Sequence, residues 1–394
     1  EAGVDALVIA APEGFASVTG ASAGVPALFR RAGAALALLP AEANAPVAAV
    51  ATDIAEAGLA AAGVRDLRIH PSWIEAVDFA PDVPLAEAMA AANAGRPAGY
   101  SRPPTFSRDA AFAHLRNLLN ARGLSRGTVG LDLDFWPAAD HAALLHAMPA
   151  QRFVDGSRLF DRIRAVKTPA AIARLTVGAE LAEAGVEVLL GALECGMTRQ
   201  EMAAAWSAGV DAEAQRRGVL RPRRAEYIAF GPNPWSGGDR LAVGDIVKID
   251  VGCAVDGALS DAARTVSFGA PRPRSRQIHE ALLAGFEAGR ALLGPGVKLA
   301  DIHAAATRAV RAAGLPGWTR GHVGHGLGAG VFGEMWPFLS AEATAMAEPG
   351  MVLAFETPFY ANGEGGFIIE DQFVITADGA EAVWRLPHDL TVIG

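Results

Sequence analysis

Residues 245–269 read DIVKIDVGCAVDGALSDAARTVSFG and predict two apolar strands joined by a tight turn. The Asp256-Gly257 pair is typical of a two-residue hairpin turn, because both central positions of such a turn need positive φ. With this turn, Asp250 lies opposite Ala263 on the neighbouring strand. The stretch therefore predicts a hairpin whose register is set by its own turn.

The hairpin carries two carboxylates on one face. Asp261 is the diagonal neighbour of Asp250, with a backbone separation of roughly 7–8 Å. Two acids on one buried face repel each other unless a proton or a cation lies between them. The pair is a first indication of a metal site, although aspartates are also common beside turns for purely structural reasons.

Composition limits the classes to which the chain can belong. A length of 394 residues favours two domains, and 51% hydrophobic with 20% charged residues is ordinary for a folded protein. The formal net charge of −9 offers no basic surface, so we expect no nucleic-acid partner. No apolar run approaches the length of a membrane span, so we expect no membrane partner.

The two cysteines exclude a disulfide framework and are compatible with a reducing cytoplasm, which is the expected location. The chain begins with Glu1 rather than Met, which is consistent with a removed leader.

The first part of the chain alternates short apolar segments with Ala-rich helical stretches, which predicts an α/β layer domain. The apolar segments are residues 4–11, 35–39, 47–51 and 129–133. A basic segment then precedes Thr168-Pro169, which is a helix start. We place the domain boundary before that segment, giving domains of residues 1–155 and 156–394.

A second acid pair lies near the C-terminus. Two strands are predicted around the loop 362–365, with Ala361 opposite Phe367. In that register Glu370 is the diagonal neighbour of Glu356. The second hairpin thus repeats the arrangement of the first with two glutamates.

His325 is flanked by glycines in GHVGHGLG, and glycines leave an imidazole accessible to other groups. A glycine-rich turn without chemistry is the alternative. Four buried carboxylates without cations would cost more than a domain's stability margin, so either they lie apart or metal is present. A set of oxygens with one nitrogen suits two divalent ions such as Mn, Co, Fe or Zn, about 3.5–4 Å apart when carboxylates bridge them.

Five residues of this chain resemble the metal-ligand set of the methionine aminopeptidase, prolidase and creatinase superfamily, in type and in order. They are Asp250, Asp261, His325, Glu356 and Glu370. Residues 1–151 also resemble the smaller N-terminal domain of prolidases and creatinase. The resemblance implies a mixed α/β (α+β) chain, with a creatinase/prolidase-type N-terminal domain before a pita-bread catalytic domain.

The resemblance also implies roles. Asp250 chelates one metal, Asp261 and Glu370 bridge, and His325 with Glu356 completes the other site. A metal-bound hydroxide attacks the carbonyl of a small peptide or amide, and Glu356 relays its proton. The implied enzyme is a dinuclear hydrolase of the Xaa-Pro aminopeptidase or dipeptidase type, a homodimer, with manganese as the expected ion.

Three positions depart from the family pattern. Phe332 stands where family peptidases usually carry a second histidine, and Ile368 stands where proline-specific members often carry an arginine. The loop before the first metal strand offers Trp235 in place of a further histidine. These changes predict a drier substrate pocket, less suited to a charged peptide terminus. His322 is a catalytic candidate that could replace a lost donor, with a structural histidine as the alternative.

Two other functions stay open. The NPW and EMWP segments, the latter with the pocket candidate Trp336, are also similar to dimethylsulfoniopropionate lyases of the same superfamily, although the additional aspartate of those lyases is absent. A creatinase-like C–N hydrolase of a small metabolite is the related possibility. A degenerate, non-catalytic binding protein is the non-enzymatic alternative, against which the intact ligand set argues.

Overall fold

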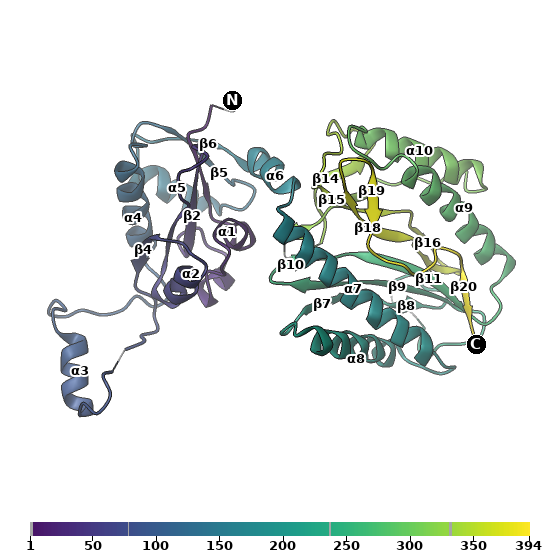
Figure 1. The fold of residues 1–394 in the computed structure, drawn as a ribbon, viewed down its shortest axis with the longest axis horizontal. Helices are drawn as coiled ribbons and strands as arrows, with labels where there is room; N and C mark the ends of the chain where they lie inside the picture. Colours follow the sequence, from purple (N-terminus) through teal and green to yellow (C-terminus); the bar gives the residue numbers. More distant parts are fainter. Residues whose placement is uncertain (1–2, 78, 236–237, 331–332) are drawn as a thin grey trace. The chain divides into compact units, whose positions relative to one another are not determined.

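The computed structural model describes residues 3–77, 79–235, 238–330 and 333–394 (Figure 1). The chain divides into two compact units, Glu1–Phe160 and Asp161–Gly394, and α6 (Ser157–Ala165) contains the division. The expected boundary at residue 155 lies a few residues earlier. In the part of the chain that the structure describes, no helix is long and apolar enough to cross a membrane.

The first unit is built on a sheet of six described strands in the order β4-β3-β2-β1-β5-β6. Alternate side chains of β1 enter two different apolar cores, one with α4 and α5 and the other with α1 and α2. The unit is therefore the α/β layer domain that the sequence predicts.

The strands of the first unit are β1 (Ala6–Ile9), β2 (Ala35–Pro40), β3 (Ala48–Thr52), β4 (Asp66–His70), β5 (Thr128–Leu131) and β6 (Arg152–Asp155). Its helices are α1 (Pro12–Thr19), α2 (Glu56–Ala61), α3 (Leu85–Asn93), α4 (Arg108–Ala121) and α5 (Ala138–Ala147), with 3-10 turns at Val25–Phe29 and Asp53–Ala55.

The second unit contains a sheet of twelve described strands, eight of them in the order β13-β10-β9-β11-β18-β15-β12-β14. The path consists of β9 (Ile246–Val255), β10 (Ala258–Leu259), β11 (Ala262–Phe268), β12 (His322–Gly326), β13 (Gly328–Ala329), β14 (Met335–Ser340), β15 (Val352–Glu356) and β18 (Glu370–Ile375). Added to it are β7 (Arg223–Glu226), β8 (Ala229–Phe230), β19 (Ala380–Ala382) and β20 (Thr391–Ile393), while β16 (Phe359–Ala361) and β17 (Gly365–Phe367) form a separate ladder.

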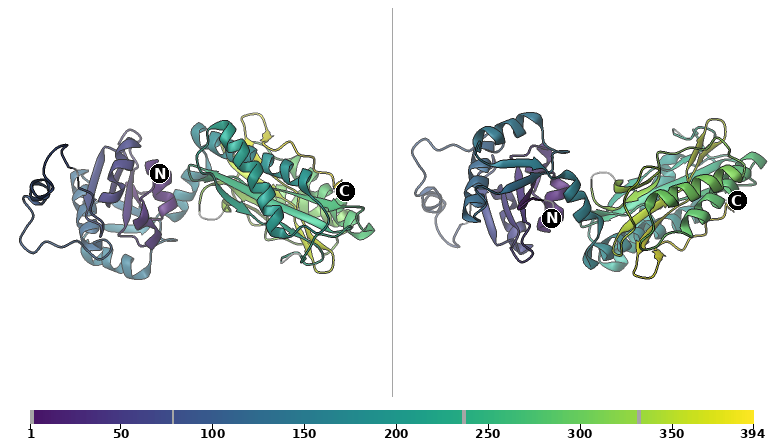
Figure 2. Two further views of the ribbon diagram at one scale, coloured as in Figure 1. Left: turned by 90° about the horizontal axis from the view of Figure 1, so that it is seen from below. Right: turned by 90° about the horizontal axis from the view of Figure 1, so that it is seen from above.

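Two helix pairs cover this sheet. The first pair, α7 (Pro169–Ala192) and α8 (Arg199–Arg217), shares a core with β9 and β11. The second pair, α9 (Pro273–Arg290) and α10 (Leu299–Ala312), shares a core with β15 and β18. Figure 2 shows the first pair in front of the sheet from below and the second pair in front from above. Each hairpin of the sheet is thus supported by its own pair of helices.

The first hairpin has the predicted geometry. Asp256 and Gly257 have φ values of 46° and 83°, as a tight turn with two left-handed residues requires. Asp250 lies opposite Ala263, which confirms the predicted register. Position 252 in this hairpin requires a glycine, because a Cβ there would lie 1.9 Å from the Ser260 carbonyl oxygen.

The predicted register of the second hairpin is wrong by two residues. Ala361 lies opposite Gly365 rather than Phe367, and Glu356 faces Glu370 directly rather than diagonally. The cause is a tighter connection, since only residues 362–364 separate the paired positions. A shift by two residues keeps every side chain on its face, so both glutamates still project from the same side.

The two hairpins join where Ala263 of β11 pairs with Glu370 of β18. One row of residues consequently crosses four strands, in the order Asp250, Ala263, Glu370 and Glu356. Side chains that are neighbours in such a row project from the same face. The small Ala263 side chain leaves space between Asp250 and Glu370.

Helix α9 approaches β15 through a glycine next to this row. A Cβ added to Gly289 would lie 2.1 Å from Cζ of Phe355, and Phe355 is fully buried directly before Glu356. The ring cannot move aside without disturbing the core, because protein interiors are close-packed. Close contact between α9 and the sheet therefore depends on this glycine.

We expect Gly289→Ala to destabilise the protein by about 1–3 kcal/mol through overpacking. Gly191→Ala, on the exposed last turn of α7 where a Cβ meets nothing within 4 Å, is the matched control and should change stability by at most about 1 kcal/mol. Urea unfolding of both variants checks the difference. Equal midpoints would show that α9 can shift to admit the methyl group.

Candidate metal centre

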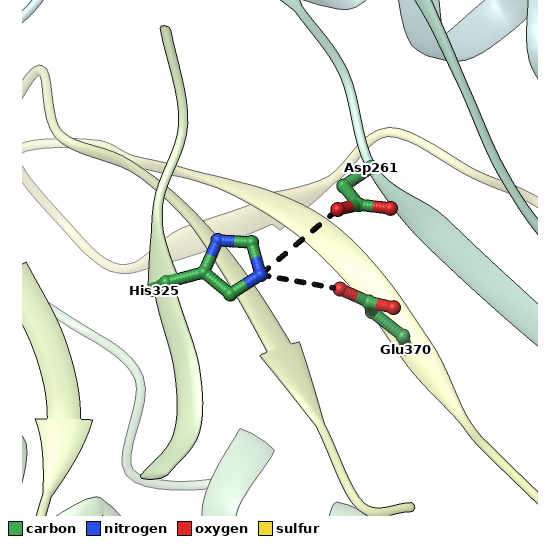
Figure 3. Close-up of side chains that lie close together, drawn as sticks. All are labelled: Asp261, His325 and Glu370. Atoms are coloured by element: carbon green, nitrogen blue, oxygen red, sulfur yellow. Dashed lines mark ion pairs between the residues drawn. The ribbon is translucent and has the colours of Figure 1, made fainter. Parts of the chain in front are cut away.

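Asp261, His325 and Glu370 come together on one face of the sheet (Figure 3). One donor atom from each lies within 4.8 Å of the others. Nε2 of His325 is 4.0 Å from Oδ2 of Asp261 and 3.9 Å from Oε1 of Glu370. The sheet thus brings together one ligand candidate from each of three separate segments of the chain.

The two carboxyl groups of this cluster are held in an environment that disfavours their charge. Burial, followed by repulsion from neighbouring carboxylates, raises the pKa of both Asp261 and Glu370 well above the ordinary value. Asp250 and Glu356 are among the repelling groups in both cases. A cation at this point would remove the cause of the repulsion.

The His325 imidazole presents an unprotonated nitrogen, rather than an N–H group, to the two acids. Burial lowers the pKa of its imidazole to about 4, so the ring is neutral at physiological pH. Nδ1 lies 3.3 Å from the Gly326 carbonyl oxygen. Donation from Nδ1–H to that carbonyl leaves Nε2 unprotonated and directed at the two carboxylates.

These observations fit a divalent cation. The cluster offers two carboxylate oxygens and one imidazole nitrogen, and no sulfur, which suits hard to borderline ions. Glu370 is buried, Asp261 is half-buried, and the two acids are close together. Asp250 and Glu356 extend the same face along the row described above.

Asp250 has a cationic neighbour that was not singled out from the sequence. Nζ of Lys248 lies 2.9 Å from Oδ2 of Asp250, and Lys248 is itself buried. The two residues are two positions apart on β9, so strand alternation alone puts them on one face. That alternation was the available signal.

Glu356 lies in a second charged group. Nη2 of Arg320 donates to its Oε1 at 2.9 Å. Burial is the main reason why the pKa of Glu356 is raised, and Arg320 opposes the shift. Nδ1 of His322 is 3.6 Å from the same oxygen, and its Nε2 is 3.3 Å from Oε2 of Glu334. His322 therefore lies between two carboxylates beside the cluster.

Arg320 and Glu334 were also missed as site residues. Both belong to segments that the sequence had marked, the glycine-rich stretch around His325 and EMWP. Nothing in the local pattern of either segment indicates that the two meet. Glu356 is the partner of Arg320, and His322 lies within 3.6 Å of Glu356 and 3.3 Å of Glu334. The pairing of β12 with β14 brings these segments together.

The predicted pocket residues have different environments. Trp235 is 69% exposed and stacks on Tyr360, with ring centroids 4.4 Å apart. Trp336 packs against the core beneath α9 and α10. Ile368 is buried, and its backbone N–H donates to Oγ1 of Thr265 at 2.7 Å. Phe332 lies outside the described residues. A role for these residues in substrate binding stays a prediction.

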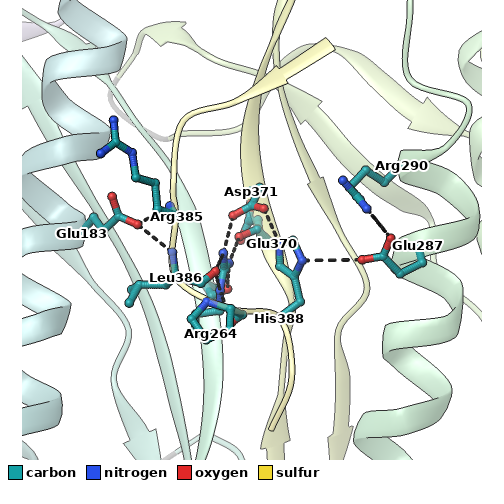
Figure 4. A network of polar contacts seen from close by, with 11 residues as sticks. Glu183, Arg264, Glu287, Arg290, Glu370, Asp371, Arg385, Leu386 and His388 are labelled. Atoms are coloured by element: carbon teal, nitrogen blue, oxygen red, sulfur yellow. Dashed lines mark hydrogen bonds and ion pairs between the residues drawn. The ribbon is translucent and has the colours of Figure 1, made fainter. Parts of the chain in front are cut away.

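A buried polar network supports the last ligand candidate from behind (Figure 4). Arg264 donates from Nη1 to the Glu370 carbonyl oxygen and from Nη2 to Oδ1 of Asp371, both at 2.7 Å. Its guanidinium also binds the carbonyl oxygen of Leu386. The other oxygen of Asp371 is 2.5 Å from Nε2 of His388. The network holds the backbone of Glu370 in place.

We expect Arg264→Met to cost about 3–5 kcal/mol of unfolding free energy, because it leaves the Asp371 carboxylate buried without its cation. The control is Arg290→Met. Arg290 forms an ion pair with Glu287 in which both side chains are more than 40% exposed. That change should cost less than about 1 kcal/mol. Denaturant unfolding of the two variants decides, and similar losses would contradict the assigned importance of the buried pair.

Asp261→Asn and Asp250→Asn should act in opposite directions on the metal-free protein. Because the pKa of Asp261 is raised on folding, its contribution to stability is present below the ordinary carboxyl pKa and is lost as pH rises through the raised value. A neutral amide at position 261 should therefore stabilise the chelator-treated protein at neutral pH. Asp250→Asn should destabilise it, because Lys248 loses its partner.

Thermal melts with and without added Mn²⁺ check this pair of variants. We also expect Asp261→Asn to reduce the stabilisation that the ion provides. A lower melting temperature for chelator-treated Asp261→Asn than for the unmodified protein would contradict the charge repulsion described here.

Comparison with known proteins identifies the family to which the chain belongs. The family model for metallopeptidase family M24 matches residues 173–377, more than half of the chain. YkvY of Bacillus subtilis is 28% identical over 71% of this chain and 77% of its own length. An Xaa-Pro dipeptidase of Lactobacillus helveticus is 26% identical over 68% of this chain and 73% of its own.

Solved structures show the same fold. An Xaa-Pro dipeptidase from Bacillus anthracis superposes with a TM-score of 0.76 at 19% identity, covering 99% of this chain and 96% of its own. The dipeptidase PepE from Mycobacterium ulcerans gives 0.75 at 25% identity, covering 100% and 94%. The predicted architecture, an N-terminal α/β domain followed by a pita-bread domain, is confirmed. The chain belongs to metallopeptidase family M24.

Proposed function

We propose that this metallopeptidase cleaves small peptides of the Xaa-Pro type and uses two divalent ions held by Asp250, Asp261, His325, Glu356 and Glu370. Relatives named Xaa-Pro dipeptidase support the substrate class. The observation that carries the proposal is the row across β9, β11, β18 and β15, which gathers the acids on the face to which His325 contributes Nε2.

The ions would supply Lewis-acid activation of the scissile carbonyl and of the water that attacks it. Glu356 is suited to accept and return a proton, because burial raises its pKa above the ordinary carboxyl value. Arg320, 2.9 Å away, orients that carboxylate. His322 lies beside Glu356 and is positioned to interact with substrate.

Other parts of the proposal rest on the family resemblance. The first unit, Glu1–Phe160, is proposed to be a creatinase/prolidase-type domain. Manganese as the ion, a homodimer as the assembly and the cytoplasm as the location stay predictions.

The test begins with elemental analysis of protein purified without chelator and reloaded with Mn²⁺ or Co²⁺, followed by assay of Xaa-Pro dipeptides. We expect about two ions per chain and turnover that chelation removes. His325→Ala should weaken ion binding more than about a hundredfold, whereas His322→Ala should leave the ion content unchanged and lower kcat/KM.

Two results would count against the proposal. Fully loaded protein that hydrolyses no Xaa-Pro dipeptide would favour a metabolite substrate of the creatinase or lyase type. Equal loss of ions in His322→Ala and His325→Ala would show that His322 is a ligand rather than a substrate contact.

A further inference from the structure

Lys248 is a buried cation on the face that carries the acids. Lys248 is 6% exposed, and its Nζ lies 2.9 Å from Oδ2 of Asp250. An ammonium in such a place is unfavourable unless an anion accompanies it. An anionic partner therefore stabilises Lys248 at this position.

Two aromatic rings also lie near the Lys248 ammonium. Nζ lies 5.9 Å from the centroid of the Tyr227 ring and 5.7 Å from that of Tyr360, both within the range of cation–π attraction. Within the described residues, Asp250 is the one carboxylate in ion-pair distance of Nζ. The rings favour the ammonium but cannot replace an anion.

With an ion bound, the Asp250 carboxylate would be shared between two cations. Under the proposed function its carboxylate is a metal ligand, and its charge is then largely compensated by a divalent ion. The ammonium of Lys248 remains beside it with less compensation than before. A further anion at this position would restore the balance, and the substrate is the component that arrives there.

Ring contacts extend from Lys248 through Tyr360 to an exposed side chain. Trp235 is 69% exposed and stacks on Tyr360 at 4.4 Å between centroids, while Tyr360 borders Lys248. A Cβ at Gly366 would meet Cδ of Lys248 at 3.3 Å and Cδ1 of Tyr360 at 3.5 Å, so this glycine permits their approach. The series offers aromatic faces for an apolar ring, with an ammonium at its inner end.

We propose that Lys248, bordered by Tyr227 and Tyr360, binds a carboxylate of the substrate. This inference rests on the proposed function and narrows it to short peptides with a free C-terminus. In such a peptide a short chain of bonds joins the scissile carbonyl to the terminal carboxylate. The ammonium that reads the carboxylate must then lie directly beside the metal ligands, as Lys248 does.

The test compares N-acetylproline with N-acetylprolinamide, which differ in the charge of the terminal group. Calorimetric titration of the full, metal-loaded chain should show that the acid binds at least about tenfold more tightly than the amide. Lys248→Met should abolish that preference, and Lys248→Arg should retain most of it. Lys298→Met, an exposed lysine at the start of α10, is the matched control and should keep the full preference.

Ion content is measured in parallel and should be the same in all variants. The inference is overturned if the unmodified chain binds acid and amide equally, or if Lys248→Met with a full complement of ions keeps the preference. Hydrolysis of glycylproline decides separately on the proposed function. A chain that does not hydrolyse this dipeptide, yet binds the acid through Lys248, would refute the peptidase proposal and uphold the carboxylate site.

Discussion

Pairing between β11 and β18 is the contact on which the site depends. Each hairpin forms from residues close in the chain, but the aspartates meet the glutamates only because Ala263 lies opposite Glu370. The pairing gathers like charges on one buried face, which opposes folding unless cations compensate them. The rest of the domain accordingly has to hold an arrangement that its own electrostatics disfavour.

The protein compensates this charge unevenly. Lys248 accompanies Asp250, and Arg320 accompanies Glu356, whereas Asp261 and Glu370 face a neutral imidazole. The central pair is thus the part of the face with the greatest demand for an ion, and the flanking acids already have partial partners. Under the proposed function, the fixed cations at the two flanks would place positive charge beside the substrate and beside Glu356.

Support for this arrangement comes from outside the face. Arg264 binds the backbone of Glu370 and the side chain of Asp371, so β18, which carries this ligand candidate, is fixed by a buried ion pair. On β15, the strand paired with β18, Gly289 allows α9 to pack against Phe355, next to Glu356. Both contacts stabilise backbone rather than ligand side chains, which leaves the carboxylates free to bind ions.

Turn chemistry and strand alternation, which can be read from the sequence, were sufficient to predict much of the two hairpins. Turn chemistry at Asp256 determined the register of the first hairpin, and strand alternation placed its acids on one face. In the second hairpin the loop length was misjudged, yet an error of two residues preserved the face of Glu356. Residues distant in sequence were a different matter, because alternation shows which side a group faces but not its neighbours. Only the tertiary pairing of strands decided that Arg320 would meet Glu356 and that the two acid pairs would share one centre.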